Sequence, residues 1–539
     1  MSAEITSGND RQRTAIELVV VIGFCAFLFL YNLGAFGLVG ADEPRYAQIA
    51  REMLASHKYV TPVLYGQPWL EKPILFYWRA AISYKVFGVS DAAARLPSAS
   101  LAFGLVILTY FWMKKFRPGA QLDAALVLGA SALMIAYGRA ASMDMSLAAP
   151  FCAGMLCWWG WHQTGQRWWL VVFYFFIAIG TLAKGPVAPF LAGLIVVGYA
   201  AVRRDWKLIS GTLWIPGILA YVAVALPWFV LVQMETPSFF RTFFLEHNLE
   251  RFGTGKYHHP APIWFFIPIL LAAVAPWTTY VVAAMVDVVR DWQFRRRNQQ
   301  ELGDGLTLFL LLWTVIPVVF FSFSQSKLPG YILPAVPPAL LLAAEYLHRQ
   351  TEERTSPNYP LLVVHASLAA ILIAALLIAP AKMLKLPPTP QAVFLAAAIG
   401  VVVFFGVLLS VAARGNAALR FVTLIPVILG VTFILKTVAP VIDATQSERP
   451  VASALSAAGV ASNATVATFK AKREVEYGVA WYRNQPIKVY ERLEIPASEH
   501  VVITRAGSEP ELREILPGRE LKKIGEFVPQ RLEFFGVGK

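Results

Sequence analysis

The amino-acid sequence predicts a polytopic α-helical membrane protein with about 13 membrane-spanning helices and a small α/β domain at its C-terminal end. The composition is 57% hydrophobic and only 15% charged, whereas soluble domains carry roughly 25% charged residues. Apolar stretches of about 20 residues, long enough to cross the ~30 Å hydrocarbon core of a bilayer, recur along the chain. The tail differs, because short β-like runs alternate there with turns.

Thirteen apolar segments form the predicted membrane domain, residues 16–439. Several of them are short or contain a proline, so the number of spans is accurate only to one or two. The segments cover roughly residues 16–36, 96–113, 121–138, 145–161, 168–183, 186–202, 209–231, 263–284, 305–323, 330–347, 360–379, 391–412 and 418–438.

Basic residues gather in alternate loops and indicate the orientation, because loops rich in Lys and Arg face the cytoplasm. Residues 1–15 are therefore predicted to be cytoplasmic. The odd number of spans places the C-terminal domain, residues 440–539, on the other side of the membrane. The same rule explains the net charge of +13 without a nucleic-acid partner. The basic residues are Arg11, Arg13, Lys114, Lys115, Arg117, Arg203, Arg204, Lys207, Arg290, Arg295, Arg296, Arg297, Arg349, Arg354, Arg414 and Arg420.

The tail of about 100 residues is long enough to form a small α/β domain. None of its residues forms a motif that indicates chemistry, so we expect a structural or docking module. The predicted strands cover residues 464–469, 475–482, 487–490, 501–504 and 532–535, and a helix is predicted at 509–515.

The first outer loop, residues 37–95, begins with a short charged run at 40–46. Pro44 fits the first turn of a helix, where its missing N–H costs nothing, and Asp42 or Ala41 then lies at or near the cap. Apolar residues at helical spacing predict a short amphipathic helix on the outer membrane surface. Asp42 and Glu43 are either an N-cap pair that suits the helix dipole or acids directed at a substrate. The apolar stripe consists of Tyr46, Ile49, Ala50, Met53 and Leu54.

Further charged residues lie at the predicted outer ends of the helices. Glu71 and Lys72 lie between two prolines; the carboxylate suits a metal or a sugar hydroxyl and the lysine a phosphate, while an interfacial anchor is the alternative. Arg139, Asp144 and Lys184 lie at helix tips, where charged groups must face water, a cavity or one another. Ordinary short loops are the alternative there.

The outer loop at 232–262 holds three of the eight histidines. His247 follows Glu246 and lies near Arg251, and a histidine beside carboxylates suits a general base or a metal ligand. Lys327 and Tyr331 lie at the same level on the next outer tip.

The predicted outer face therefore gathers both acids and cations. Carboxylates suit a sugar or an acceptor hydroxyl, and cations stabilise the charge that develops on a leaving phosphate. Displacement at an anomeric carbon passes through an oxocarbenium-like state, so this combination favours an enzyme that transfers a sugar from a lipid phosphate. If the acceptor is an ionised phosphate, no strong base is required and the carboxylates orient the donor. The residues are Asp42, Glu43, Glu71, Asp144 and His247, with Lys72, Arg139, Lys184, Arg251 and Lys327.

Six short motifs follow one another along the chain. They are Asp-Glu-Pro-Arg-Tyr at 42–46, Glu-Lys-Pro at 71–73, Asp144, Thr-Leu-Ala-Lys-Gly-Pro at 181–186, Glu-His at 246–247 with Arg-Phe at 251–252, and Ser-Lys-Leu-Pro at 326–329 with Tyr-Ile-Leu-Pro at 331–334. In this combination and order they resemble the bacterial aminoarabinose transferases that modify lipid A, which are related more distantly to the protein O-mannosyltransferases of the GT-C glycosyltransferase fold. The resemblance covers roughly residues 15–440.

The resemblance implies a GT-C type glycosyltransferase of the bacterial inner membrane with a periplasmic C-terminal domain. The donor would be a sugar on undecaprenyl phosphate and the acceptor a lipid A phosphate. We expect a monomer among membrane lipids, without nucleic acid. Asp42 and Asp144 resemble the essential carboxylates, and Glu71 and His247 resemble ligands of a divalent metal such as zinc. The donor-phosphate contacts would be Lys72 and Arg251, with Lys184 and Lys327 as further cations; the pocket would include Arg45, Tyr46, Tyr331 and Arg139, and Glu43 is a third candidate acid.

Three alternatives remain open at this point. The first is the same class of reaction with another sugar, a hexose or a uronic acid, or with another acceptor, a core oligosaccharide or a protein. The second is a flippase and the third is a scaffold. A flippase for a lipid-linked sugar would carry charged residues near the bilayer midplane and repeat symmetry. A scaffold of an envelope complex would tolerate mutation of all the charged outer loops.

Overall fold

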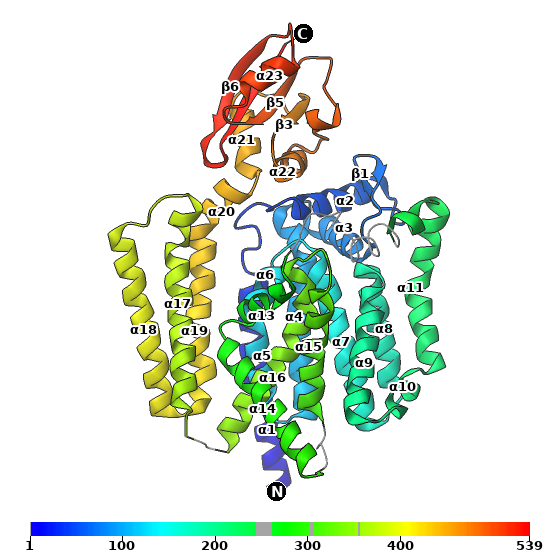
Figure 1. Ribbon diagram of the computed structural model, residues 1–539, viewed down its shortest axis with the longest axis vertical. Helices are drawn as coiled ribbons and strands as arrows, with labels where there is room; N and C mark the ends of the chain where they lie inside the picture. Colours follow the sequence, from blue (N-terminus) through cyan, green and yellow to red (C-terminus); the bar gives the residue numbers. More distant parts are fainter. Residues whose placement is uncertain (1, 244–260, 301–304, 354–355, 539) are drawn as a thin grey trace.

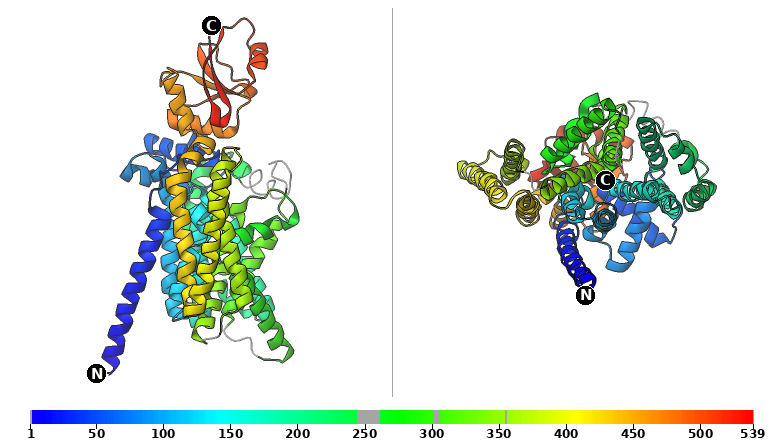
Figure 2. Two further views of the ribbon diagram at one scale, coloured as in Figure 1. Left: turned by 90° about the vertical axis from the view of Figure 1, so that its left-hand side faces the viewer. Right: turned by 90° about the horizontal axis from the view of Figure 1, so that it is seen from below.

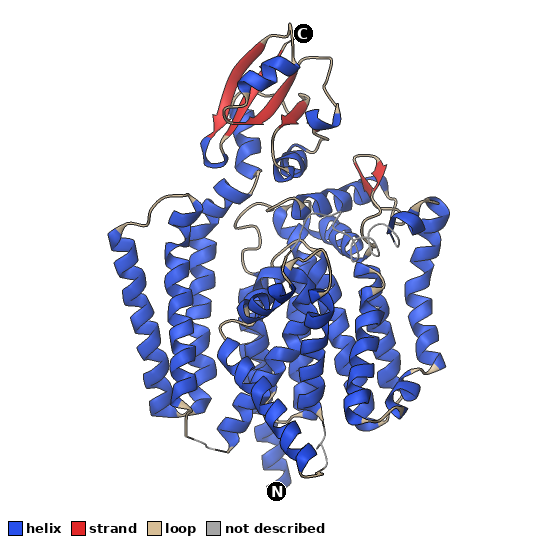
Figure 3. Cartoon of the chain, viewed as in Figure 1, coloured by secondary structure: helices blue, strands red, loops and turns tan. Residues whose placement is uncertain are grey.

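The computed structural model describes residues 2–243, 261–300, 305–353 and 356–538. A bundle of long helices carries a small domain at one end, and the N-terminus lies at the opposite end (Figure 1). The side view shows the same arrangement, with the first helix extending away from the C-terminal domain (Figure 2). Strands occur in the C-terminal domain and in one short hairpin (Figure 3).

The helical membrane fold is confirmed, and every predicted span coincides with a helix or a broken pair of helices. Among the described residues, seven helices are long and apolar enough to cross a membrane, and nine if each bent pair counts as one span. The seven are Arg11–Leu30 (α1 and η1), Asp91–Phe116 (α4), Ile215–Glu235 (α11), Pro329–Glu352 (η5 and α16), Tyr359–Met383 (α17), Pro390–Arg414 (α18) and Asn416–Gln446 (η6, α19, η7 and α20). The other predicted spans are Met143–Thr164 (α7), Trp168–Lys184 (α8), Val187–Arg203 (α9) and Leu306–Ser322 (α15).

Two spans are broken by sharp bends. The first, Gln121–Gly129 (α5) and Ala132–Gly138 (α6), bends by 63°, and the second, Ile263–Ala273 (η4 and α13) and Thr278–Arg297 (α14), bends by 115°. Pro276 lies at the second break, where it cannot donate a helical hydrogen bond. The short helix Lys207–Thr212 (α10) joins α9 to α11 at the end of the bundle far from the C-terminal domain (Figure 1).

The outer loop folds into two helices, Asp42–Ser56 (α2) and Leu75–Phe87 (α3), joined by a hairpin of Val63–Leu64 (β1) and Gln67–Pro68 (β2). Ala41 is the N-cap of α2, so Pro44 lies in its first turn as predicted. The apolar stripe packs inward, and Arg45 and Gln48, which do not belong to it, are buried as well. The C-terminal domain covers this side of α2 (Figure 1); α2 is therefore not a simple surface helix.

The C-terminal domain is a mixed five-stranded sheet with helices, ordered β4-β3-β5-β7-β6. Strands β4, β3 and β5 are parallel, whereas β7 is antiparallel to β5 and β6. The elements are Arg449–Ala457 (α21), Val466–Phe469 (β3), Arg473–Arg483 (α22), Lys488–Val489 (β4), His500–Arg505 (β5), Glu509–Ile515 (α23), Leu521–Phe527 (β6) and Leu532–Val537 (β7). The predicted strand at 475–482 is wrong, because these residues form α22, and β6 was not predicted.

The C-terminal domain is joined to the outer loop by polar contacts as well as by packing. Arg449 forms ion pairs with Asp443 and Asp91 at 2.5 and 3.4 Å. The Tyr482 hydroxyl accepts a hydrogen bond from the Leu38 amide at 2.8 Å and donates one to Asp91. The domain therefore has a defined position on the membrane bundle.

A buried acid, Glu448, lies just before α21, where the chain enters this domain. Only 2% of Glu448 is exposed, and Oε2 is a buried atom without a hydrogen-bond partner among the described residues. Burial, together with the nearby Glu474 carboxylate, raises the pKa of Glu448 to about 8. The folded protein therefore keeps a proton on Glu448 at neutral pH.

The wild-type protein is expected to lose stability as pH rises from about 4.5 to about 8, and Glu448→Gln to abolish this part of the loss. The unfolded chain releases the proton near the ordinary pKa of 4.5 while the folded chain holds it up to about 8. Each pH unit in this window costs up to ~1.4 kcal/mol. Thermal unfolding of the purified protein between pH 5 and 9 measures the difference. The exposed Glu514→Gln is the control, and identical pH slopes for Glu448→Gln and wild type would contradict the assignment.

Candidate functional site

The first part of the candidate site is an arginine that contacts two carboxylates. Arg45 Nη2 lies 2.5 Å from Asp42 Oδ1 and 4.0 Å from Glu71 Oε2. The Asp42 side chain is 59% exposed, whereas that of Arg45 is 6% exposed. One acid comes from the first turn of α2 and the other from the loop between β2 and α3. A buried cation therefore fixes an accessible carboxylate at the N-terminus of α2.

Aromatic rings surround the Arg45 guanidinium. Its Cζ atom lies 4.9 Å from the centre of the Trp69 ring and 5.2 Å from that of Tyr46. A third ring, that of Tyr477, lies 5.4 Å away and belongs to the C-terminal domain. Such cation–π contacts are strongest when desolvated, as they are here.

The second part of the site is an ion pair at the outer tips of α7 and α8. Lys184 Nζ lies 2.5 Å from Asp144 Oδ1, and both side chains are partly exposed. Lys184 also lies 5.3 Å from the centre of the Tyr331 ring. The backbone at position 330 lies so close to Asp144 and Tyr137 that only glycine fits there. A Cβ atom at Gly330 would lie 2.7 Å from both Asp144 Oδ1 and the Tyr137 hydroxyl. The predicted meeting of Asp144, Lys184 and Tyr331 is therefore present in the structure.

The two parts belong to the same end of the bundle. The Ala141 amide, three residues before Asp144, donates to Glu43, the neighbour of Asp42 in the chain, at 2.6 Å. Met143 also packs in the apolar cluster that contains the buried face of α2. The acids of α2 and α7 therefore lie at the same end of the bundle, on the side of the C-terminal domain.

Glu43, predicted as a third candidate acid, has protein partners on both oxygens. Arg95 Nη2 donates to Glu43 Oε2 at 2.7 Å, and the amides of Val39 and Ala141 donate at 2.8 and 2.6 Å. Glu43 is 5% exposed and Arg95 1%. These contacts favour a structural role for Glu43 over a catalytic one.

Three further predicted pocket or phosphate residues have protein partners too. Arg139 donates to the carbonyl oxygens that end the first span, those of Leu28, Tyr31 and Asn32. Lys327 Nζ donates to the carbonyls of Ala261 and Ser324 at 3.0 and 2.6 Å. Tyr46 is 5% exposed and packs edge-on against Phe76 and Tyr77. In this structure Arg139, Lys327 and Tyr46 stabilise the walls of the site.

The predicted metal ligands and phosphate contacts are described only in part. His247 and Arg251 lie outside the described residues, and Lys72 is half-buried beside Glu71. The described residues form no group of three or more His, Cys, Asp or Glu side chains that would hold a metal. Arg45 also contacts both Asp42 and Glu71. The described residues alone therefore do not make a metal centre.

Buried donors beside Arg45 were not predicted from the sequence. Arg45 Nε, Trp69 Nε1 and the Tyr77 hydroxyl are buried without hydrogen-bond partners in the described part of the chain. Burial raises the pKa of Tyr77 well above its ordinary value, so its hydroxyl stays a neutral donor. Unpaired buried donors are costly and suit the oxygens of a bound substrate. No sequence signal separates Tyr77 from the core aromatics around it.

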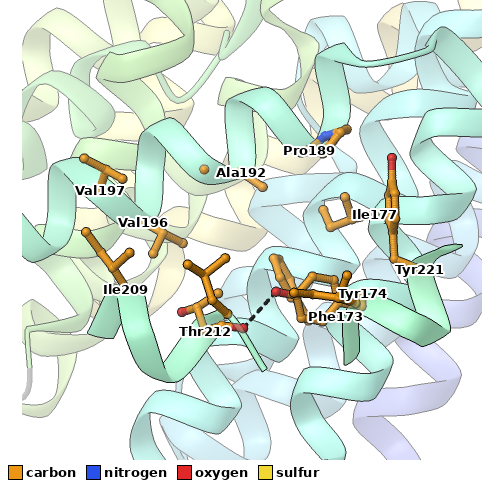
Figure 4. Close-up of a pocket in the computed structure, with 13 residues that line it drawn as sticks. Phe173, Tyr174, Ile177, Pro189, Ala192, Val196, Val197, Ile209, Thr212 and Tyr221 are labelled. Carbon is orange, nitrogen blue, oxygen red and sulfur yellow. Dashed lines mark hydrogen bonds between the residues drawn. The ribbon is translucent and has the colours of Figure 1, made fainter. Parts of the chain in front are cut away.

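A separate cavity lies inside the membrane bundle, between α8, α9, α10 and α11 (Figure 4). It has a volume of about 310 Å³ and an apolar lining. Its polar groups are already paired: the Tyr174 hydroxyl donates to the Thr212 carbonyl at 2.8 Å, and Tyr221 is bonded to Thr181 at 3.1 Å. The cavity therefore suits hydrocarbon, whereas the charged candidate residues lie at the outer end of the bundle.

Comparisons with known proteins show that the sequence is similar to membrane sugar transferases. The family profile described as dolichyl-phosphate-mannose-protein mannosyltransferase matches residues 14–243. A protein of Edwardsiella ictaluri named undecaprenyl phosphate-alpha-4-amino-4-deoxy-L-arabinose arabinosyl transferase is 31% identical over 346 residues, which are 62% of this chain and 60% of that protein. A Pseudomonas fluorescens protein of the same name is 32% identical over 345 residues, again 62% of this chain and 60% of its own. The matches thus span about 60% of the length of these curated relatives.

Solved structures extend the likeness to nearly the whole chain. The crystal structure of ArnT from Cupriavidus metallidurans bound to undecaprenyl phosphate has a TM-score of 0.76 at 22% identity, covering 96% of this chain and 97% of that one. At this identity the match shows the fold alone, a multi-pass helical protein with a C-terminal domain. The predicted polytopic helical fold is therefore confirmed, and the sequence relatives confirm the resemblance to aminoarabinose transferases.

Proposed function

We propose that this protein transfers 4-amino-4-deoxy-L-arabinose from an undecaprenyl-phosphate carrier to a lipid A phosphate, at the periplasmic face of the bacterial inner membrane. The observation that carries the proposal is that two carboxylates, Asp42 and Asp144, each paired with its own cation, lie at the same outer end of the bundle. The names of the relatives support the sugar and the carrier.

The proposed chemistry is a displacement at the anomeric carbon of the donor. An acceptor phosphate oxygen forms a bond to this carbon, and the bond from the carbon to the carrier phosphate breaks with its electron pair on the phosphate oxygen. In this scheme Lys184 stabilises the charge on the leaving phosphate, with Lys72 and Arg251 as the predicted further cations. An ionised acceptor phosphate needs no strong base.

The carboxylates then act on the sugar. The transition state is oxocarbenium-like and carries positive charge, and a 4-amino sugar carries an ammonium group at neutral pH. Asp42 is exposed enough to reach either charge, because Arg45 holds only one of its oxygens in the described structure. In this scheme Asp144, which pairs with Lys184 at 2.5 Å, acts on the sugar with its other oxygen.

The arrangement of charges supports the proposed orientation. The loops rich in Lys and Arg, such as Arg295–Arg297 at the end of α14, belong to the end of the bundle far from the C-terminal domain (Figure 1). By the positive-inside rule that end is cytoplasmic. The candidate site then faces the periplasm.

A divalent metal held by Glu71 and His247 remains part of the proposal. Metal analysis of the purified protein is expected to find about one ion per chain, and Glu71→Gln to lower this content. An equal metal content in wild type and Glu71→Gln would remove Glu71 from the set of ligands.

Mass spectrometry of lipid A from cells with and without the protein tests the function directly. We expect an added mass of one aminopentose per modified phosphate when the protein is present. Addition of a hexose or uronic acid instead would assign another donor. Unchanged lipid A, in cells that make the lipid-linked aminoarabinose, would overturn the proposed acceptor.

A further inference from the structure

The C-terminal domain extends one helix into the candidate site, and this helix buries two different faces. Val475 and Val479 of α22 belong to the apolar core of the C-terminal domain. Tyr477 and Trp481, on the other face, belong to the core formed by α2, α3 and their neighbours. The helix α22 is thus shared between the two parts of the protein.

The face of α22 that meets α2 contacts the arginine of the candidate site. Tyr477 is 5% exposed, and its ring lies 5.4 Å from the Arg45 Cζ atom. Trp69 and Tyr46 contact the same guanidinium. Of these three rings, only that of Tyr477 comes from outside the outer loop.

A second set of contacts fixes α22 along the length of α2. Arg51 Nη1 donates to the Trp481 carbonyl at 2.9 Å and to Asn484 Oδ1 at 3.0 Å. The Arg51 Cζ atom lies 3.6 Å from the centre of the Trp481 ring. Trp481 Nε1 in turn donates to Asp91, at the start of α4. These contacts leave α22 little freedom to slide along α2.

We propose that α22 is a positioning element of the transferase site and that Tyr477 is a positioning residue for Arg45 and, through it, for Asp42. This inference rests on the proposed function. Tyr477 keeps water from the Arg45 guanidinium and restricts its rotamers, so the ion pair with Asp42 stays in one geometry. The C-terminal domain is therefore a working part of the site as well as a docking module.

The test compares three variants of the full-length protein in lipid nanodiscs, with an undecaprenyl-phosphate aminosugar and lipid A. Tyr477→Leu removes the aromatic face, and we expect kcat to fall about tenfold while KM for the donor changes less than twofold. Tyr477→Phe keeps the face and is expected to retain at least half of the activity. Val475→Ala, on the other face of α22, is the matched control: it lowers the stability of the C-terminal domain but leaves kcat unchanged.

A second measurement does not depend on activity. Hydrogen exchange of the amides in the first two turns of α2 is expected to be several-fold faster in Tyr477→Leu than in wild type or Tyr477→Phe. If the wild type transfers no sugar, the proposed function fails, while the exchange experiment still tests the contact. Wild-type kcat in Tyr477→Leu, or unchanged exchange in α2, would overturn the positioning role.

Discussion

Replacing Asp42 or Asp144 by asparagine is expected to lower sugar transfer to lipid A at least ~100-fold. Each substitution keeps the shape of the side chain but removes the negative charge that faces the donor. Groups that act on charge or protons in the transition state contribute about 10²–10⁴ in rate. Asp144→Asn also leaves Lys184 without its 2.5 Å counter-charge. Initial rates with purified protein in nanodiscs measure the effect.

Melting temperatures and a matched control variant distinguish a loss of catalysis from a loss of folded structure. Both variants should retain the wild-type melting temperature within a few degrees, because the Asp42 side chain is exposed and Asp144 is partly exposed. The matched control is Asp287→Asn, which breaks an exposed aspartate–arginine pair with Arg349 at 2.6 Å. It should leave the rate unchanged. A variant of Asp42 with more than a tenth of the wild-type rate would remove this residue from the chemistry.

Loss of Glu43 is expected to have the largest effect on stability, about 3–5 kcal/mol for Glu43→Ala. Arg95 would keep a buried charge without its acid, although it still donates to the carbonyls of Leu33, Phe36 and Gly37. The amides of Val39 and Ala141 would also lose their acceptor. The free energy of unfolding in mixed detergent measures the loss.

A double-mutant cycle tests the cause of this loss. Removing both charges with Glu43→Leu and Arg95→Leu should cost less than the sum of the single changes, because no buried charge is then left unpaired. The exposed pair of Arg513 and Glu509 supplies the comparison, where Arg513→Ala should cost less than about 1 kcal/mol. Strict additivity of the buried pair would contradict the proposed role of Glu43.

The membrane fold could be predicted because each span needs a long apolar segment and hydropathy reports this directly. The sequence pattern of α22, in contrast, led to a wrong prediction of a strand at 475–482. Val475 and Val479 pack on one side of the helix and Tyr477 and Trp481 on another. Two helical faces offset by two residues look like the alternation of a strand. Only the tertiary contacts separate the two patterns.

The candidate site was predicted from charged residues at the outer ends of the predicted helices. Such a prediction is correct only for the charged side chains that face the site. Asp42, Asp144 and Lys184 lie at outer helix ends, where Asp144 pairs with Lys184 and Asp42 pairs with Arg45. Arg139 and Lys327 have the same sequence signature, yet both donate to backbone carbonyls. The nearest backbone acceptors depend on how distant segments pack, so the sequence alone does not reveal them. The Tyr477 contact is missed for the same reason.

The contact between α2 and α22 also has a consequence for how the protein is made. Arg51 and Trp481 are 430 positions apart in the chain, so at 5–20 residues per second synthesis separates them by roughly 20–90 s. Helix α2 therefore lacks its partner until the ribosome has made α22. If α22 positions Arg45 as proposed, nascent chains already inserted in the bilayer gain full activity only after that step.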